Sequence, residues 1–152
     1  MASTVFSFVN LISLVGWALL CALPGRRWAE HVSRWVVPGL LAGAYVVIIA
    51  GSWGRSPGGF SSLADVALLF QNPWLLLAGW IHYLAFDLLI GGWIVRDARA
   101  RGLAHGWLLP SLVLTFLFGP AGWLSYLGVR LALRRSSNAS ARKPENAALD
   151  AV

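Results

Sequence analysis

Cysteine is nearly absent from this chain, because Cys21 is the only one among 152 residues. A single thiol excludes an intramolecular disulfide framework and any metal site built from several cysteines. A haem between the helices would need a second ligand at matching depth, but His31 and His105 fall in predicted connections. We therefore expect no metal and no cofactor.

Charged residues are also scarce, and this bounds the class of protein. They make up 12% of the sequence, against about 25% in an ordinary soluble domain, whereas hydrophobic residues make up 58%. The sequence contains no nucleotide-binding motif and leaves no room for a soluble domain. Any chemistry must therefore take place within a bilayer or at its surfaces, with membrane lipids as partners and no nucleic acid.

Four apolar stretches each approach the length of about 20 residues that crosses the hydrocarbon core of a bilayer. They are Val5–Leu23, Trp35–Trp53, Trp74–Val95 and Trp107–Val129. The sequence therefore predicts an all-α, polytopic membrane protein with four transmembrane helices in one domain, residues 1–135. The last helix can be broken at Gly119-Pro120. Residues 136–152 carry too little apolar surface to fold alone, and we expect a disordered polar tail.

Local signals mark the boundaries before the third stretch. Asn72-Pro73 supplies a helix cap followed by a first-turn proline. The apolar run from Leu63 to Phe70 is too short to cross, so we expect it to lie in the membrane interface.

No basic segment precedes the first apolar stretch, which begins almost at the amino terminus. A cleaved secretory signal carries such a segment, so we expect this stretch to remain as an uncleaved anchor. An Arg-rich and Ser-rich transit peptide has no room in the sequence either, which favours a bacterial plasma membrane.

Arginine clusters flank the first and third connections, which the positive-inside rule therefore assigns to the cytoplasm. The clusters are Arg26, Arg27 and Arg34, and Arg96, Arg99 and Arg101. Four spans divide the basic residues six against six, whereas a re-entrant hairpin at Gly119-Pro120 divides them eleven against one. We expect four spans, and the side of the carboxyl terminus stays open.

The third stretch carries two ionisable residues, His82 and Asp87, near its middle. A carboxylate at the centre of a transmembrane helix costs about 2.5–3.5 kcal/mol on insertion scales, so a partner, a cavity or a function normally accompanies it. Helical spacing puts Trp80 and Tyr83 on the face of Asp87, whereas His82 lies about 140° away. The two ionisable side chains should not touch. They can flank a long ligand, or only hold helices together by hydrogen bonds.

Small residues indicate where helices pack. Gly39 and Gly43 form a GxxxG pattern, which permits a close contact either inside the bundle or in a homodimer. In the fourth stretch small and polar residues recur at intervals of three or four, and they are Ser111, Thr115, Gly119, Gly122 and Tyr126. This stripe can line a cavity with hydroxyls for Asp87, or form only a helix contact.

Three characteristic segments lie within residues 72–127. They are GWIHYLAFD at 79–87, RDAR at 96–99 and LTFLFGPAG at 114–122. These segments resemble the core of the abscisic acid-deficient-four-like family, known from the plant membrane protein required for neoxanthin formation. The resemblance implies a small polytopic protein of xanthophyll metabolism that acts, in plants, at the step from violaxanthin to neoxanthin.

That step opens a carotenoid epoxide to an allenic alcohol, so an enzyme for it would be an isomerase without a redox cofactor. It needs an acid at the epoxide oxygen and a base that removes a proton from the polyene. The candidate catalytic residues are Asp87, as a neutral carboxylic acid, and His82, as a neutral imidazole. The candidate substrate-binding residues are Trp80, Tyr83, Phe86, Ser111 and Thr115.

Two other classes of function stay open. A non-catalytic carotenoid or lipid binder that helps a partner enzyme of carotenoid metabolism would explain why no span carries a second carboxylate. A small proton-coupled carrier would explain the single intramembrane acid, although the four stretches show no internal repeat.

Overall fold

The computed structural model describes residues 1–133, which are helical throughout apart from turns and loops. Three helices are long and apolar enough to cross a membrane, and they cover Ala2–Ala22, Arg27–Ser52 and Pro73–Ala100. The predicted class, an all-α polytopic membrane protein, is confirmed. The tail predicted at residues 136–152 lies outside the described residues.

The first two crossings form one layer. Helix α1 covers Ala2–Ala22, and the second crossing joins α2 (Arg27–His31), a π-helical turn η1 (Val32–Val36) and α3 (Val37–Ser52) without interruption. The π-helical turn comes directly before Pro38, whose missing N–H would leave a regular α-helical ladder incomplete. The hydroxyl of Ser33 in this turn donates to the carbonyl of Gly16 over 2.9 Å, and so ties the two crossings together.

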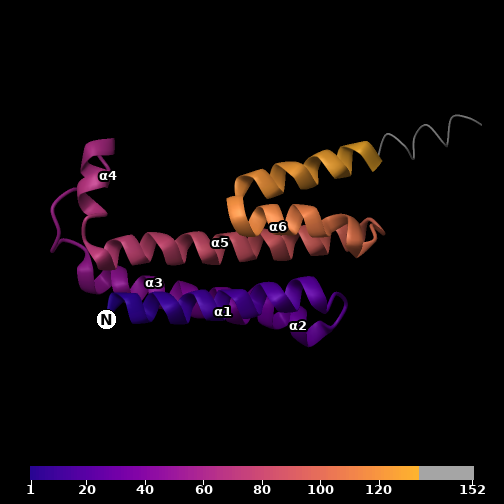
Figure 1. Cartoon of the computed structure of the whole chain (residues 1–152), viewed down its shortest axis with the longest axis horizontal. Coiled ribbons are helices and arrows are strands. Elements are labelled where there is room, and N and C mark those ends of the chain that lie inside the picture. Colours follow the sequence, from indigo (N-terminus) through magenta and orange to yellow (C-terminus); the bar gives the residue numbers. More distant parts are fainter. Residues whose placement is uncertain (134–152) are drawn as a thin grey trace, which may run out of the picture.

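Helix α5, Pro73–Ala100, is the centre of the molecule. Half of the residues in its most apolar segment are buried inside the molecule. The corresponding share is 28% for α1 and 17% for the second crossing. The predicted start is confirmed, since the Asn72 side chain accepts a hydrogen bond from the Trp74 N–H over 2.9 Å. Figure 1 shows α1 and α3 on one side of α5 and the last helices on the other.

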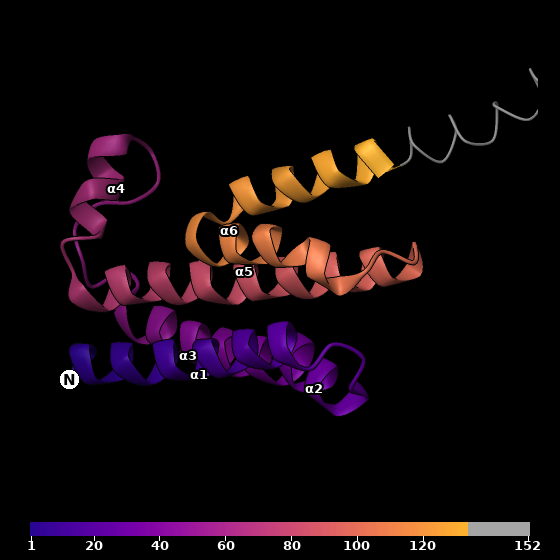
Figure 2. The same ribbon diagram turned by 45° about the vertical axis from the view of Figure 1, so that its right-hand side comes forward.

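The fourth apolar stretch does not cross the membrane as one helix, and this differs from the expected four spans. After a 3-10 turn η2 (His105–Leu108), helix α6 (Leu109–Phe118) ends at Gly119, whose φ is +40°. A helix over residues 120–133 then runs back beside α6, as Figures 1 and 2 show. The predicted break at Gly119-Pro120 is therefore present, because Pro120 has no N–H to continue the helix and Gly119 tolerates the positive φ.

The two arms of this re-entrant hairpin, residues 109–133, pack through the small and polar stripe. A side chain at Gly122 would collide with the backbone of Thr115. Ser125 donates to the hydroxyl of Ser111 over 2.8 Å, and Thr115 donates to the carbonyl of Ser111 over 2.7 Å. The stripe therefore forms a contact between helices, and in the described part of the chain its hydroxyls bond within the hairpin instead of to Asp87.

A polar cluster fastens the returning arm to the end of α5. Tyr126 donates to Asp97 Oδ2 over 2.6 Å, and the Arg101 guanidinium forms two hydrogen bonds with the same carboxylate, at 2.8 and 3.0 Å. Arg130 lies 3.7 Å from Asp97. The hairpin therefore begins and ends at the same end of the bundle.

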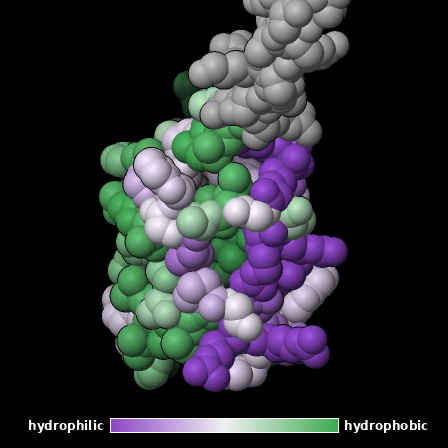
Figure 3. Space-filling view, turned by 90° about the vertical axis from the view of Figure 1, so that its right-hand side faces the viewer, coloured by the Kyte–Doolittle hydropathy of each residue, from purple (hydrophilic) through white to green (hydrophobic). Residues whose placement is uncertain are grey.

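Basic side chains gather at that end, which Figure 3 shows as a purple band. The arginines there are Arg26, Arg27, Arg34, Arg96, Arg99, Arg101 and Arg130. Arg55 is the only described arginine in the loop at the opposite end. By the positive-inside rule we expect the arginine-rich end to face the cytoplasm.

Helix α4, Leu63–Leu69, lies at the other end and stands across the direction of α5 in Figure 2. Its first turn is capped by Ser62, whose Oγ accepts a hydrogen bond from the Asp65 N–H over 3.1 Å and whose hydroxyl donates to the Asp65 carboxylate over 2.8 Å. The interfacial position of this short helix stays a prediction.

The GxxxG residues of α3 face outward. A Cβ atom built on Gly39 or Gly43 would meet nothing within 4 Å among the described residues. The pattern is therefore not used inside the bundle, and a homodimer through it stays a prediction.

Candidate functional site

Asp87 occupies the middle of α5, where the tip of the re-entrant hairpin covers it. Its side chain is buried, and the residue is only 8% exposed. A Cβ atom on Gly119 would lie 2.6 Å from Asp87 Oδ1 and 3.4 Å from Oδ2. The absence of a side chain at the hairpin tip is thus what makes room for the carboxyl group.

The carboxyl group of Asp87 has few polar neighbours among the described residues. Oδ2 of Asp87 is buried and has no hydrogen-bond partner among the described residues. Tyr83, one turn earlier, donates to the carbonyl of Phe116 over 3.2 Å, and its hydroxyl also lies beside Asp87. No described cation forms an ion pair with Asp87. The acid therefore lies in an apolar environment, which is energetically unfavourable unless another interaction compensates.

A second orphaned oxygen lies near the same depth on α1. The hydroxyl of Ser13 is buried and has no hydrogen-bond partner among residues 1–133. Close approaches between Gly16 and Leu88 and between Trp17 and Gly91 fix the register of α1 against α5, and so place Ser13 near the level of Asp87.

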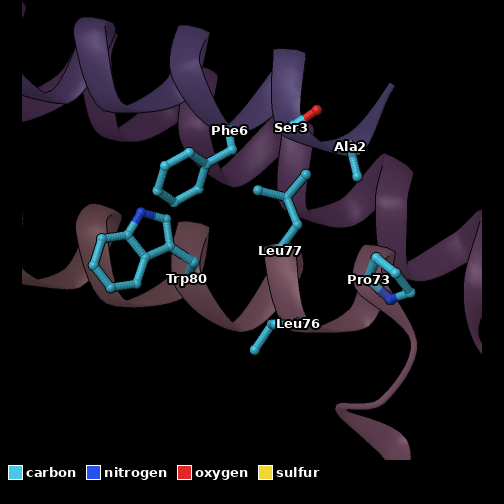
Figure 4. A pocket seen from close by; sticks show the side chains of 7 residues that line it. All are labelled: Ala2, Ser3, Phe6, Pro73, Leu76, Leu77 and Trp80. Carbon is cyan, nitrogen blue, oxygen red and sulfur yellow. The ribbon is translucent and has the colours of Figure 1, made fainter.

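An apolar cavity lies between the start of α5 and the start of α1, on the amino-terminal side of Asp87 along α5. Its volume is about 340 Å³, and Figure 4 shows the residues that line it, which are Ala2, Ser3, Phe6, Pro73, Leu76, Leu77 and Trp80. The rings of Phe6 and Trp80 lie 5.8 Å apart, and those of Trp80 and Tyr83 lie 5.4 Å apart. This row of rings leads from the end of the bundle to the residue beside Asp87.

The hairpin is too short to cover the whole length of α5. The hairpin tip meets α5 at Asp87, so it leaves uncovered the half of α5 that precedes this residue, as Figures 1 and 2 show. Leu76 is 55% exposed and Trp80 is 39% exposed. Trp80 is therefore accessible to an apolar molecule from the bilayer.

His82 lies on a different face of α5 and does not share this cavity. Its ring stacks on Phe86 at 4.6 Å and meets the edge of Tyr45 at 5.8 Å. It lines a separate cavity of about 320 Å³ between α3, α4 and α5. As the spacing predicts, His82 and Asp87 do not touch, and the structure does not join them in one site.

The predicted substrate-binding residues fall into three places. Trp80 and Tyr83 lie with Asp87, and Phe86 lies with His82 on a surface that is exposed on the isolated chain. Ser111 and Thr115 are buried in the contact between the hairpin arms. A role of any of them in binding stays a prediction, but only the first pair adjoins the carboxyl group.

Sequence reasoning missed the contact of Gly119 with Asp87 and the place of Ser13. The GP pair signals a break, but no spacing along the chain tells at which depth the break meets α5. No group of three or more His, Cys, Asp or Glu side chains in the part of the chain that the structure describes is arranged to hold a metal ion.

Comparison with known proteins gives one match. The family model described as ABA DEFICIENT 4-like matches residues 4–126, which include the three crossings, α4, α6 and the first part of the returning arm. Neither the curated proteins nor the solved structures gave a match.

Proposed function

This chain belongs to the ABA DEFICIENT 4-like family, and from that premise we propose that it is a carotenoid isomerase of the neoxanthin-synthesis type in a bacterial plasma membrane. The family suggests the coarser role, in carotenoid metabolism. The observation that carries the finer proposal is the buried carboxyl group of Asp87, which has an oxygen without a partner among the described residues and lies near the inner end of the row of rings formed by Phe6, Trp80 and Tyr83.

In the proposed reaction, Asp87 gives its proton to the epoxide oxygen, and the bond between that oxygen and the ring carbon that bears the polyene breaks. The neighbouring polyene carbon then loses its proton, and the electrons of its C–H bond form the second double bond of the allene. One proton is added and one is removed, so the product is an isomer of the substrate and no oxidant is needed.

A single carboxyl group can serve both steps. Once Asp87 has given up its proton it is a base, and the carbon that loses a proton is adjacent to the epoxide. The scheme therefore does not require His82, which lines the other cavity. Tyr83 is suited to orient the carboxyl group or the new hydroxyl, because its own hydroxyl lies beside Asp87.

The direct test uses the purified full chain in lipid nanodiscs with violaxanthin as the only pigment. We expect an allenic isomer to form, and Asp87→Asn to abolish it, because the amide cannot donate the proton. Asp65→Asn is the matched control, since Asp65 lies in α4 at the far end of the bundle, and it should convert violaxanthin normally. Normal conversion by Asp87→Asn would remove Asp87 from the mechanism.

A second candidate function is a non-catalytic carotenoid carrier or helper of a partner enzyme. It is favoured by the small number of acid–base groups around Asp87, since no described cation forms an ion pair with it and the phenol of Tyr83 lies beside it. A helper would leave violaxanthin unchanged in nanodiscs and would raise conversion only when membranes from a carotenoid-producing host are added.

A further inference from the structure

The cavity beside His82 is lined mainly by aromatic and aliphatic side chains. It encloses about 320 Å³, a volume typical of the smaller ligand sites, and it lies between α3, α4, α5 and the loop that precedes α4. Its walls are rich in rings, namely Tyr45, Trp53, Phe60, Phe70 and His82. Trp53 and Phe60 pack against each other at 5.4 Å, and both line this cavity.

His82 contributes polar ring nitrogens to the wall of this cavity, which also contains Tyr45. The His82 ring contacts the rings of Phe86 and Tyr45. Neither ring nitrogen forms a hydrogen bond to another described residue, although the side chain is exposed on the surface of a membrane-crossing helix. In hydrocarbon an unsatisfied imidazole is costly, so a ligand with a hydroxyl or another oxygen would be stabilised here.

An exposed apolar stripe continues from His82 along α5. Phe86, Leu89 and Trp93 follow at intervals of four, three and four residues and are 55%, 39% and 39% exposed. The distance along the helix from Leu75 in the cavity to Trp93 is about 27 Å at a rise of about 1.5 Å per residue. The surface therefore suits a long, rigid, apolar molecule and not only a single ring.

We infer that the His82 cavity and the stripe of Phe86, Leu89 and Trp93 bind a ring-ended polyene alcohol. The ring lies in the cavity, its hydroxyl bonds with His82, and the polyene runs over the stripe. This site is separate from the row of rings near Asp87, on another face of α5. The choice of a polyene rests on the proposed function, whereas the need for a ring and a hydroxyl rests on the cavity and on His82.

Two carotenoids that differ only in their hydroxyls provide the probes. Zeaxanthin carries a hydroxyl on each end ring, and β-carotene has the same skeleton without them. We would titrate each into the full chain in nanodiscs and follow binding by quenching of tryptophan fluorescence. Wild type should bind zeaxanthin about tenfold more tightly than β-carotene, which is the effect of about one well-formed hydrogen bond.

Three variants locate the site. His82→Phe keeps the ring stack but removes the nitrogens, and should reduce the preference for zeaxanthin to about twofold or less. Gly79→Leu fills the cavity and should weaken binding of both probes, since a Cβ atom there already lies 3.3 Å from the Phe70 ring. Gly128→Leu is the matched control, because that position lies in the returning arm of the hairpin and faces open space, and it should bind both probes like wild type.

Equal affinity of wild type for the two probes, or an unchanged preference in His82→Phe, would overturn the inference. Normal binding by a correctly folded Gly79→Leu would do the same. Zeaxanthin has no epoxide and cannot be converted, so these measurements are independent of the violaxanthin experiment. Failure of either proposal is therefore visible while the other still stands.

Discussion

The carboxyl group of Asp87 lies against Gly119, the residue at which the re-entrant hairpin reverses its direction. One residue comes from the middle of a crossing helix and the other from a break in the last apolar stretch. Their contact places an acid at the inner end of a hairpin that does not cross the bilayer. The approach to the acid from the uncovered half of α5 depends on this geometry.

Replacing Gly119 with alanine should disturb the hairpin tip. The φ of +40° is unfavourable for alanine, and its Cβ would lie 2.6 Å from Asp87 Oδ1. We expect a loss of about 1–3 kcal/mol in the free energy of unfolding, together with a loss of conversion. Thermal unfolding in detergent measures the first effect.

Gly128→Ala is the control for that change, because Gly128 lies in the returning arm with nothing within 4 Å of a built Cβ atom. It should unfold at the same temperature as wild type or slightly above. Equal stability of Gly119→Ala and Gly128→Ala would contradict the close contact at the hairpin tip.

The path of the hairpin determines the side on which the chain leaves the membrane. A reporter fused after Leu133 should be on the same side as one inserted at Gly102, because Asp97 and Arg130 lie together. A reporter inserted at Gly54, beside the lone Arg55, should be on the opposite side. Reporters that are active on only one side of a membrane would measure this, and opposite sides for Leu133 and Gly102 would mean four crossings.

The tie between Tyr126 and Asp97 should stabilise the base of the hairpin. Tyr126→Phe removes a donor to a partly buried carboxylate, and a hydrogen bond to a charged group contributes about 1.5–3 kcal/mol. Tyr45→Phe makes the same chemical change on α3, where no hydrogen bond of the hydroxyl is recorded, and should cost less.

A double-mutant cycle of Tyr126→Phe with Asp97→Asn separates this hydrogen bond from general packing. The two changes should be strongly non-additive, because each removes the same interaction. Additive losses in the free energy of unfolding would show that Tyr126 contributes through packing alone.

The helices were accessible to sequence reasoning because their signals are local. Hydropathy predicted the three crossings, and Asn72-Pro73 predicted the first residue of α5. The break at Gly119-Pro120 was also visible, because proline and glycine act on the backbone where they stand. Whether the two halves would continue across or fold back depended on contacts such as Ser125 with Ser111, and these form only between helices.

The candidate site was predictable only in part for the same reason. The spacing along α5 correctly separated His82 from Asp87 and grouped Trp80 and Tyr83 with the acid. The hydroxyls of Ser111 and Thr115, which a buried acid could have used, are instead consumed inside the hairpin. Helical periodicity shows which residues share a face, but it does not show which neighbour that face meets.

Trp80 should matter for binding along the row of rings near Asp87. Trp80→Leu removes the ring between Phe6 and Tyr83 and should raise the KM for violaxanthin about fivefold or more with a smaller change in kcat, since it contributes to binding in the ground state as well as in the transition state. Trp107→Leu, at a position 72% exposed in η2, is the matched control. An unchanged KM for Trp80→Leu would place the substrate elsewhere.

The stability of Asp87→Asn distinguishes a functional acid from a structural one. If Asp87 were retained to hold helices together, removing its acid group should destabilise the protein. The environment points the other way, because Oδ2 has no partner among the described residues and no described cation faces it. A group that costs free energy without a compensating bond is typical of a site kept for its activity. We therefore expect the free energy of unfolding of Asp87→Asn to lie within about 1 kcal/mol of the wild-type value, or above it, while the variant loses conversion. A loss of about 3 kcal/mol or more in chemical denaturation would identify the carboxyl group as a structural tie instead.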